Sequence, residues 1–534
     1  MSAALWVAFA TALFLVLNRY IEFRQAVAAI QHCPGFRTVF SAFTDFNEIF
    51  MLVPIPGVTI GSFRAWHGKY EDFKHFDRDI ISHVSAFPSI WRSFFVADPA
   101  AIKEITAQRT RFPKPMWQYA VLRFFGNNIV ASEADEWRRF RKITAPAFSE
   151  PNNKLVWEET VRIMNGLFDD VWGARERIVS DHAVEITLPL LTITHHALAR
   201  HQIALLVIGA AGFGRRVTWK QDDVVGPGHS MTFKEALHTV SKDVVAKLLF
   251  PEWVLRYSPL KRLRTVSAAF AELEDYMLEM CAARRAVAAE EKAEAEAKAA
   301  RHDLFSSLLD ASDDEADGLG GAGLSDRELL GNIFIFLLAG HETTAHTLCF
   351  TFALLAFHPD EQDKLYRHIK RVLSDGRTPT YQDMGLLTQC EAVFYETLRM
   401  YPPAVVVPKY AAEDATLTTR TGAGDAVTVP VPRGSGVTIN VCALHYNPHY
   451  WDEPETFRPD RFLGDWPRDA FVPFSSGARS CLGRRFFETE GIAILTMLIA
   501  RYRVELKDEP EYAHESMAER KARLMRCRPG LTTT

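Results

Sequence analysis

The pattern of hydrophobic and polar positions predicts a mainly helical chain with a small β region. The longest predicted helix begins at Ser325, which forms a capping-box pattern with Glu328, and ends before Pro359. This helix is apolar nearly all round, so we expect it to be buried through a large domain. A membrane span is not expected here, because the polar residues 341–344 interrupt the apolar run.

Further helices are predicted on both sides of this one. Residues 270–301 are rich in Ala, Glu, Lys and Arg, which is typical of a solvated helix. A helix over about 383–400 is stopped by the prolines at 402–403, and a last helix should occupy much of 481–502. The acidic, glycine-rich residues 310–324 predict a flexible loop.

Short β-branched runs predict the β region. They lie at 404–409, 427–432 and 437–441, the last two on either side of a glycine-rich turn. Helical segments outnumber these runs. We therefore predict one mainly α domain with a small sheet, over residues 31–534.

The N-terminus differs in composition from the rest of the chain. The run Ala3–Leu17 has Thr11 as its only polar residue and would reach about 22 Å as a helix, short of the roughly 30 Å hydrocarbon core. Apolar residues after the run extend it, and bilayer thinning absorbs the difference. Arg19 and Arg24 follow the run and no basic residue precedes it, which favours a cytoplasmic location for the rest. We interpret residues 1–30 as an uncleaved membrane anchor and linker, not a cleaved signal peptide.

Composition and charge are otherwise those of a soluble globular protein. The chain is 48% hydrophobic and 24% charged, and its formal net charge of −5 gives no support for nucleic-acid binding. Its seven cysteines include no C-x-x-C pair. Neither a disulfide framework nor a zinc finger is therefore indicated, and a reducing compartment fits best.

Two groups of histidines have spacings that could suggest a metal-binding site. Residues 190–201 hold three histidines, but His195 and His196 point to different faces, and we interpret this stretch as an insertion or a gene-model artefact. His341 and His346 resemble the H-E-x-x-H zinc motif. Their spacing of five residues places them about 140° apart around a helix, off a common face, so zinc chemistry is not predicted.

The strongest chemical signal is the stretch Phe474–Gly483, which carries Cys481 between a glycine-bearing turn and a predicted helix start. A thiolate at a helix N-terminus is stabilised by unpaired N–H groups and by the helix dipole. Gly477 leaves room for a flat ligand against the backbone, and Arg479 adds a cation. Taken alone, the pattern also fits an inert structural cysteine beside a turn.

A second signal interrupts the long apolar helix. Ala339–Thr344 place the carboxylate of Glu342 and the hydroxyl of Thr343 where unsatisfied polar groups are costly. These groups would suit a local opening in which a small ligand or a water chain reaches an acid and a hydroxyl. Alternatively, Thr343 bonds the carbonyl four residues before it and bends the helix. The helix alone leaves both interpretations open.

Taken together, the motifs of this chain resemble those of the cytochrome P450 family. In order along the chain, the family shows W-x-x-x-R, A-G-x-E-T-T on a long helix, E-x-x-R, P-x-R-F and F-x-x-G-x-R-x-C-x-G. The matching stretches here begin at Trp137, Ala339, Glu396, Pro459 and Phe474. The resemblance extends from about residue 30 to 510. It implies the cytochrome P450 fold, preceded by an N-terminal transmembrane anchor helix.

The resemblance implies a role for each matched residue. Cys481 is similar to the axial thiolate ligand of the iron in heme b, which favours O–O cleavage. Glu342 and Thr343 resemble the acid–alcohol pair that delivers protons during oxygen activation. The residues similar to heme-holding groups are Trp137, Arg141, Lys409, Phe474 and Arg479, with Lys at 409 where the family more often has Arg. Those that resemble the structural triad behind the heme are Glu396, Arg399 and Arg461.

The resemblance also implies a reaction. An enzyme of this type inserts one oxygen atom of O2 into a C–H or C=C bond. The segments at substrate-facing family positions, 116–130, 334–339 and 404–407, are apolar and aromatic, which predicts a lipophilic substrate. The resemblance is strongest to fungal, basidiomycete-type members that oxidise terpenoids and other secondary metabolites.

The chain has no room for a flavin or nicotinamide domain, so electrons must come from a separate protein. Arg138, Arg139, Lys142, Arg484 and Arg485 would form a basic patch suited to an acidic NADPH–cytochrome P450 reductase, with cytochrome b5 as a further candidate donor. A merely solvated basic face is the alternative. Together with the anchor, this implies a single-pass protein of the endoplasmic reticulum membrane with its catalytic domain in the cytosol.

Two other functions stay open at this point. The first is a peroxide isomerase or dehydratase of the same fold; such enzymes tend to lose the acid–alcohol pair, so Glu342 and Thr343 argue against it. The second is a non-catalytic heme-binding protein, which the basic patch and the anchor argue against.

Overall fold

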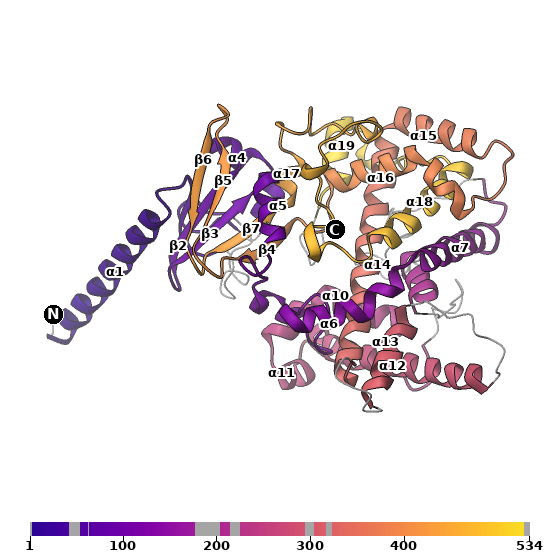
Figure 1. The fold of residues 1–534 in the computed structure, drawn as a ribbon, viewed down its shortest axis with the longest axis horizontal. Helices are drawn as coiled ribbons and strands as arrows, with labels where there is room; N and C mark the ends of the chain where they lie inside the picture. Colours follow the sequence, from indigo (N-terminus) through magenta and orange to yellow (C-terminus); the bar gives the residue numbers. More distant parts are fainter. Residues whose placement is uncertain are drawn as a thin grey trace. The chain divides into compact units, whose positions relative to one another are not determined.

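The computed structural model describes residues 3–41, 54–61, 63–176, 203–213, 225–293, 304–316 and 323–527. The chain forms two compact units (Figure 1). Unit 1 comprises Met1–Pro115, Arg399–Thr456 and Trp466–Cys481. Unit 2 comprises Met116–Leu398, Phe457–Asp465 and Leu482–Thr534. The predicted insertion at 190–201, with its histidines, lies outside the described residues.

Unit 1 contains a five-stranded mixed sheet in the order β1-β2-β3-β7-β4 and a two-stranded sheet of β5 and β6. The strands are β1 Gly35–Phe40, β2 Ile80–Phe87, β3 Trp91–Val96, β4 Val406–Tyr410, β5 Ala415–Arg420, β6 Ala426–Val431 and β7 Gly436–Asn440. Strand β7 pairs in parallel with β3 and antiparallel with β4, so Ile439 faces both Val96 and Val407. The three predicted runs correspond to β4, β6 and β7.

The sequence pattern did not predict strands β1, β2, β3 or β5. Strand β2 shows why, because Ser82 and His83 lie fully buried among its apolar residues and disguise the run. Hydrogen bonds reach both residues: the Ser82 hydroxyl donates to the Cys33 carbonyl at 2.6 Å, and His83 Nε2 lies 2.8 Å from the Thr38 hydroxyl, whereas His83 Nδ1 has no partner among the described residues. Such pairing across the sheet is not visible in a local pattern.

The helices of unit 1 flank the sheets. They are α1 Ala3–Ala29, α3 Arg64–Gly68, α4 Glu71–His75, α5 Pro99–Ala107 and α17 Val441–His445, with the short turns η7 Arg468–Ala470 and η8 Gly477–Arg479. The Asp98 side chain caps α5 by accepting from the N–H groups of Ala100 and Ala101. Helix α1 is long and apolar enough to cross a membrane, and its first three turns are exposed.

Unit 2 is helical (Figure 1). Its α-helices are α6 Ala134–Thr144, α7 Glu150–Gly166, α9 Ile203–Val207, α10 Phe233–Leu249, α11 Glu252–Tyr257, α12 Lys261–Ala293, α13 Leu304–Ala316, α14 Asp326–Phe357, α15 Pro359–Val372, α16 Thr388–Met400, which ends across the boundary with unit 1, α18 Arg484–Arg501 and α19 Met517–Leu524. Its short turns are η1 Met116–Leu122, η2 Ala145–Phe148, η3 Leu167–Trp172, η4 Ile208–Gly212, η5 Tyr381–Leu386, η6 Pro459–Phe462 and η9 Pro510–Tyr512.

The long helix α14 forms the core of unit 2, as predicted. Ser325 and Glu328 make the expected capping box, and His358 caps the end before Pro359. Neighbouring helices on several sides contact α14, among them α9, α12, α13, α15 and α18. Its most apolar stretch is 72% buried, which agrees with a core helix and not with a membrane span.

Two predicted boundaries were wrong. Residues 310–316, expected to be part of a flexible loop, form the end of α13, because the buried Leu308 and Leu309 extend an apolar stripe into the acidic run. The helix predicted over 383–400 starts as the turn η5, because Asp383 caps Thr380, and becomes α-helical only at Thr388.

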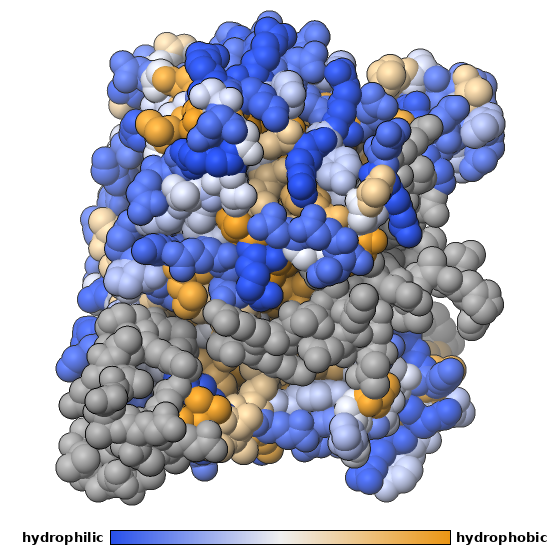
Figure 2. All heavy atoms as spheres, turned by 90° about the vertical axis from the view of Figure 1, so that its right-hand side faces the viewer, coloured by the Kyte–Doolittle hydropathy of each residue, from blue (hydrophilic) through white to orange (hydrophobic). Residues whose placement is uncertain are grey.

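Figure 2 shows the face of the molecule on the right-hand side of Figure 1. Among the residues that are coloured by hydropathy, hydrophilic side chains predominate on this face and apolar ones lie between them. Scattered exposed apolar residues of this kind are normal for a folded protein.

Candidate functional site

The loop Phe474–Cys481 in unit 1 has a backbone that is folded on itself. The Cys481 N–H donates to the Phe474 carbonyl at 2.9 Å, and the Ser480 N–H donates to the Gly477 carbonyl at 3.1 Å. Gly477 has φ +69, and a Cβ there would stand 2.7 Å from the Thr106 carbonyl of α5. Both the turn and the close approach to α5 therefore require glycine.

Cys481 is the only exposed cysteine among the seven of this chain. Four of the others are buried and two are half-buried. Burial raises the pKa of Cys349 and of Cys390 to about 12, so neither thiol ionises near neutral pH. The sequence alternative of a buried, inert thiol does not describe Cys481.

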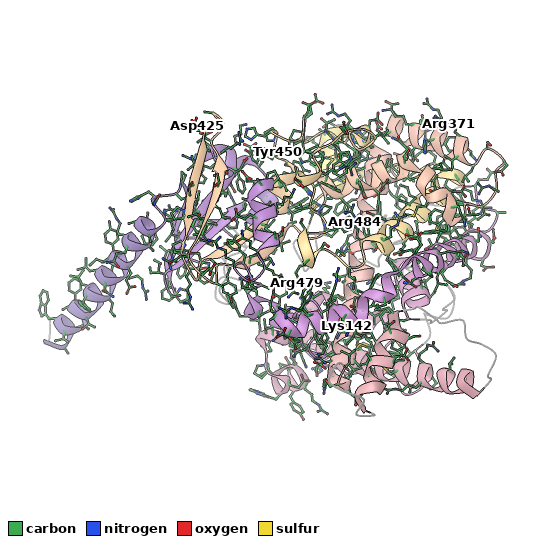
Figure 3. The ribbon with its side chains drawn as sticks, viewed as in Figure 1. Lys142, Arg371, Asp425, Tyr450, Arg479 and Arg484 are labelled. Atoms are coloured by element: carbon green, nitrogen blue, oxygen red, sulfur yellow. The ribbon has the colours of Figure 1, made fainter. Side chains whose placement is uncertain are left out.

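Three other predicted heme-holding residues lie in unit 1. Lys409 is central in β4, opposite Val437, and is only 5% exposed. A lysine is rarely buried to this extent unless it has an anionic partner. Phe474 and Arg479 are half-buried in the cysteine loop, and Figure 3 labels Arg479.

Helix α6 of unit 2 carries the W-x-x-x-R motif. Trp137 is buried and Arg141, one turn later, is half-buried. The acidic residues of α6 lie in its first turn, and Arg141 and Lys142 lie in its last turn, so both ends complement the helix dipole. The predicted helix and the shared face of Trp137 and Arg141 are confirmed.

The polar residues predicted to interrupt the long helix lie in the middle of α14. Both threonines of this stretch form hydrogen bonds to carbonyl groups of α14 itself. Glu342 is 9% exposed. The Thr343 hydroxyl donates to the Ala339 carbonyl at 2.8 Å, and the Thr344 hydroxyl donates to the Gly340 carbonyl at 2.9 Å. The bond of Thr343 to the carbonyl four residues before it is one of the two alternatives that the sequence allowed. Each hydroxyl uses its hydrogen in this bond and keeps its oxygen lone pairs as acceptors.

Two of the predicted substrate-facing segments meet in unit 2. The ring centroids of Phe125 and of Phe334 on α14 are 4.7 Å apart. Asn332 accepts a hydrogen bond from the Ile129 N–H at 3.0 Å, and a Cβ on Gly331 would stand 2.6 Å from the Asn127 carbonyl. The segment 116–130 is therefore fastened closely along the first half of α14.

The carboxylate of Glu396 is fully buried on α16. It accepts from the Arg461 Nε at 3.1 Å and from the Arg458 N–H at 2.9 Å. Arg399 is also fully buried and donates to the carbonyl of His445 at 2.8 Å, while His445 Nδ1 lies 3.1 Å from the Arg399 carbonyl. The E-x-x-R and P-x-R-F motifs thus meet through Glu396 and Arg461.

Comparison with known proteins decides the family. The family model described as Cytochrome P450 matches residues 54–525 of this chain.

The chain belongs to the cytochrome P450 family.

Its relatives share this enzyme class. Cytochrome P450 monooxygenase 124 of Postia placenta is 51% identical over 516 residues, which cover 97% of this chain and 94% of the relative. Cytochrome P450 monooxygenase AOL_s00215g278 of Arthrobotrys oligospora is 29% identical over 82% of this chain and 80% of its own. Cyclooctat-9-en-7-ol 5-monooxygenase of Streptomyces melanosporofaciens is 27% identical over 77% of this chain and 80% of its own. This P450 is a monooxygenase by family and by the first of these relatives.

The family implies heme iron, and the donor set of this P450 fits it. Within the described residues, no group of three or more His, Cys, Asp or Glu side chains is placed to hold a metal ion by itself. A heme iron needs only one protein ligand on its thiolate side. The exposed Cys481, in a loop whose Gly477 permits close backbone packing, supplies such a ligand.

Not all of the predicted basic patch of this P450 is available to a partner. Arg139 forms an ion pair with Glu328 at the start of α14, and Arg138 pairs with Asp135 in its own helix. Arg484 pairs with Glu488 at 2.8 Å, and Arg485 lies 3.7 Å from the same carboxylate. Lys142 is exposed, and in the part of the chain that the structure describes no acidic side chain pairs with it (Figure 3).

Sequence reasoning missed a network that joins α16 to α18. The Tyr395 hydroxyl donates to Glu488 at 2.6 Å, and Arg484 donates to the same hydroxyl at 3.0 Å. Tyr395 precedes Glu396, and Arg484 follows the cysteine loop. The helix with the structural carboxylate and the helix after the thiol are thereby connected. No local pattern in the sequence signals this network.

A second missed residue is Glu490 on α18. Its side chain is fully buried, and burial raises its pKa well above the usual range, an effect that the neighbouring Thr344 of α14 opposes. Burial therefore favours the neutral form of this carboxyl group. An acidic residue on a helix that also carries Arg484, Arg485 and Glu488 is expected at the surface, so nothing in the sequence indicates that Glu490 is buried.

Proposed function

We propose that this P450 inserts one oxygen atom of O2 into a lipophilic small molecule, with heme b held through Cys481. The exposed thiol of Cys481 is the observation that carries the proposal, because the other cysteines are buried or half-buried. The heme, when bound, supplies the activation of O2, and the thiolate ligand favours O–O cleavage. Trp137, Arg141, Lys409 and Arg479 would hold the heme propionates, and Phe474 would pack beside the thiolate.

The acid–alcohol pair has a defined task in this proposal. Glu342, on the buried middle of α14, would take protons from solvent, and Thr343 would hand them on from its hydroxyl. Because the Thr343 hydroxyl donates to the Ala339 carbonyl, it offers an acceptor lone pair to an incoming proton donor. This pair favours a monooxygenase over a peroxide isomerase or dehydratase of the same fold.

The substrate would be largely hydrocarbon, such as a terpenoid or another secondary metabolite. Phe125 and Phe334, from two of the substrate-facing segments, are buried and pack against each other, which keeps these segments apolar. The relative from Streptomyces melanosporofaciens is named for cyclooctat-9-en-7-ol, an alcohol with a large hydrocarbon part. Apolar lining with few polar groups suits compounds of this kind.

Electrons would come from NADPH through a separate reductase, with cytochrome b5 as a second donor. An acidic partner would find the exposed Lys142 on α6 and the half-exposed Arg485 on α18. Arg139 would contribute little, because Glu328 already neutralises it. The docking surface therefore depends on fewer cations than the sequence suggested.

The protein would be a single-pass protein of the endoplasmic reticulum membrane with its catalytic part in the cytosol. The exposed apolar α1 supports an anchor. A second apolar strip lies at α11, where the side chains of Phe250, Trp253, Tyr257 and Leu260 are between 40% and 76% exposed. Their spacing and the cations beside them are typical of a segment that rests in the lipid interface.

A reduced-plus-CO difference spectrum tests this proposal. We expect the red-shifted Soret band of thiolate-ligated heme in the wild type and its loss in Cys481→Ala. The matched variant Cys527→Ala, at a half-buried cysteine, should keep the band. A heme-loaded, folded wild-type protein without the band would overturn Cys481 ligation. For turnover, formation of a product that carries one atom of ¹⁸O₂ separates a monooxygenase from an isomerase.

A further inference from the structure

The chain that leads into α10 is fastened to α12 through one histidine. His229 Nδ1 lies 2.7 Å from Glu272 Oε2, and His229 Nε2 lies 3.1 Å from Glu279 Oε1. Both carboxylates belong to α12, seven residues apart on one face. The imidazole therefore bridges two acidic side chains with its two ring nitrogens.

A tyrosine between the two carboxylates completes the contact. The rings of His229 and Tyr276 are nearly parallel, at 8°, with centroids 3.7 Å apart. The Tyr276 hydroxyl donates to the Met231 carbonyl at 2.9 Å, so the same residue of α12 holds the chain on both sides of the histidine. A protonated imidazole over an aromatic face is a favourable cation–π arrangement.

The chemistry of imidazole makes this contact depend on its charge. A protonated imidazole has two N–H donors and can donate to both carboxylates, whereas a neutral one has a single donor. Ser230 also holds Glu272, through its N–H at 2.8 Å and its hydroxyl at 2.6 Å. Glu279 is 62% exposed and bonds to His229 alone among the described contacts of its carboxylate. Loss of the proton should therefore release Glu279 first.

We propose that His229 is a proton-operated clasp that fastens the entry of α10 to α12, closed while the imidazole is charged and loosened when it is neutral. Among the described residues, the charged groups that contact His229 are Glu272 and Glu279 of α12, whereas Glu235 of α10 bonds to Thr232 in its capping box.

The direction of the effect follows from the electrostatics. Burial lowers the pKa of His229, but the hydrogen bonds and charges of Glu272 and Glu279 outweigh it, and the net pKa lies above the usual 6.5. Since the folded-state pKa is raised, the stabilisation is fully present below pH 6.5 and is lost as the pH rises through the folded-state pKa. The clasp is therefore closed at low pH and opens as the pH rises above 6.5 and through the folded-state pKa.

The second half of α10 has a fastening that contains no histidine. Asp243 of α10 forms an ion pair with Arg262 of α12. A rise in pH should thus free the entry of α10 and leave the end near Asp243 attached. Helix α10 also contacts η1, which is part of a predicted substrate-facing segment. That functional consequence rests on the proposed function, whereas the clasp does not.

Hydrogen exchange measured by mass spectrometry on the full-length, heme-loaded protein tests the clasp. Protection of the amides of residues 226–233, corrected for intrinsic exchange rates, should fall about tenfold from pH 6.0 to pH 8.5, as expected for the loss of one charge-assisted hydrogen bond. Amides 325–329, in the capping box of α14, which no histidine holds, serve as the internal control.

Two variants of His229 imitate the closed and the loosened form of the clasp. His229→Arg, with a permanent charge and a planar group that stacks on Tyr276, should stay protected at both pH values. His229→Gln should be weakly protected at both, and Glu279→Gln should flatten the pH response. The matched variant Arg262→Gln should leave that response intact. A wild-type response that persists in His229→Gln would overturn the clasp, whatever the heme spectra show.

Discussion

One oxygen of Glu396 accepts two hydrogen bonds from a single short segment, from the Nε of Arg461 at 3.1 Å and from the N–H of Arg458 at 2.9 Å. Glu396 is fully buried and the Arg461 side chain is 7% exposed. In this low-dielectric setting the pair holds η6 against α16, and each partner satisfies the other's charge.

Arg461→Ala should therefore destabilise the protein strongly. Removal of Arg461 takes a charged partner from a fully buried carboxylate, and breaking a buried ion pair in this way costs about 3–5 kcal/mol. Thermal unfolding followed by circular dichroism should show a clearly lower Tm, with less heme retained. Arg503→Ala is the control: that side chain is 54% exposed beside Asp363, and its loss should cost under about 1 kcal/mol. Equal effects of the two variants would contradict the structural role.

Thr343→Ala should uncouple electron use from oxygenation. Without the hydroxyl, protons reach the oxygen site less selectively, and more of the NADPH consumed should end as hydrogen peroxide. The measurement is peroxide released per NADPH. Thr265→Ala removes the same kind of helix bond, to the Lys261 carbonyl at 3.0 Å, from α12 and should change nothing. An unchanged peroxide yield in Thr343→Ala would remove this residue from proton delivery.

Lys142→Glu should lower the apparent affinity of this P450 for its reductase. The exposed Lys142 has no acidic partner within the described residues, so its charge is available to an acidic protein. We expect the apparent KM for reductase to rise about fivefold, with a weaker dependence on salt, since one exposed pair is worth up to about 1 kcal/mol. Lys370→Glu on α15 is the control. If both reversals act alike, net charge and not a docking site is responsible.

Acid should destabilise the protein through two buried histidines of α14. Burial lowers the pKa of His341 to about 3 and that of His346 to about 4. Below pH 6.5 the unfolded chain binds more protons than the folded one, so stability is full above pH 6.5 and falls as the pH drops toward 4. His341→Gln should reduce the fall in Tm between pH 7 and pH 5. His514→Gln, at an exposed site, should not.

The strip at α11 should become protected at a lipid surface. In nanodiscs with anionic phospholipid, the amides of residues 250–260 should exchange more slowly than in detergent micelles, because exposed aromatic side chains such as Trp253 settle in the interface. The α15 segment around the exposed Tyr366 provides the comparison. Equal exchange of the strip in both media would restrict membrane contact to other segments.

The sequence predicted those parts of the molecule whose signal is local. The capping box of Ser325, the proline after α14 and the β-branched runs of β4 and β7 are each written in a few neighbouring residues. The paired motifs of Glu396 and Arg461 were also recognised. What could not be predicted depends on distant partners. Strand β2 contains buried polar residues, two of which are bonded to Cys33 and Thr38 far away in the sequence, and α13 continues through acidic residues because buried leucines precede them.

The same division holds for the candidate site. Sequence motifs were enough to propose Cys481, Glu342 and Lys409 as site residues, but the pairing of Arg139 with Glu328, which removes one cation from the predicted basic patch, needed coordinates. The burial of Glu490 also depends on the packing of α18 against α14, which leaves no trace in its own stretch of sequence.

Gly340, next to the buried histidine of α14, has a consequence for attempts to alter this protein. A Cβ at this position would stand 3.1 Å from Cδ1 and 3.3 Å from Cγ1 of Ile208. The two positions therefore share a fixed amount of space, and a methyl group gained at one must be given up at the other. Variants with a larger residue at position 340 alone should therefore be overpacked against Ile208. Variants that also carry a smaller residue at position 208 should keep the total side-chain volume and change the packing next to Glu342.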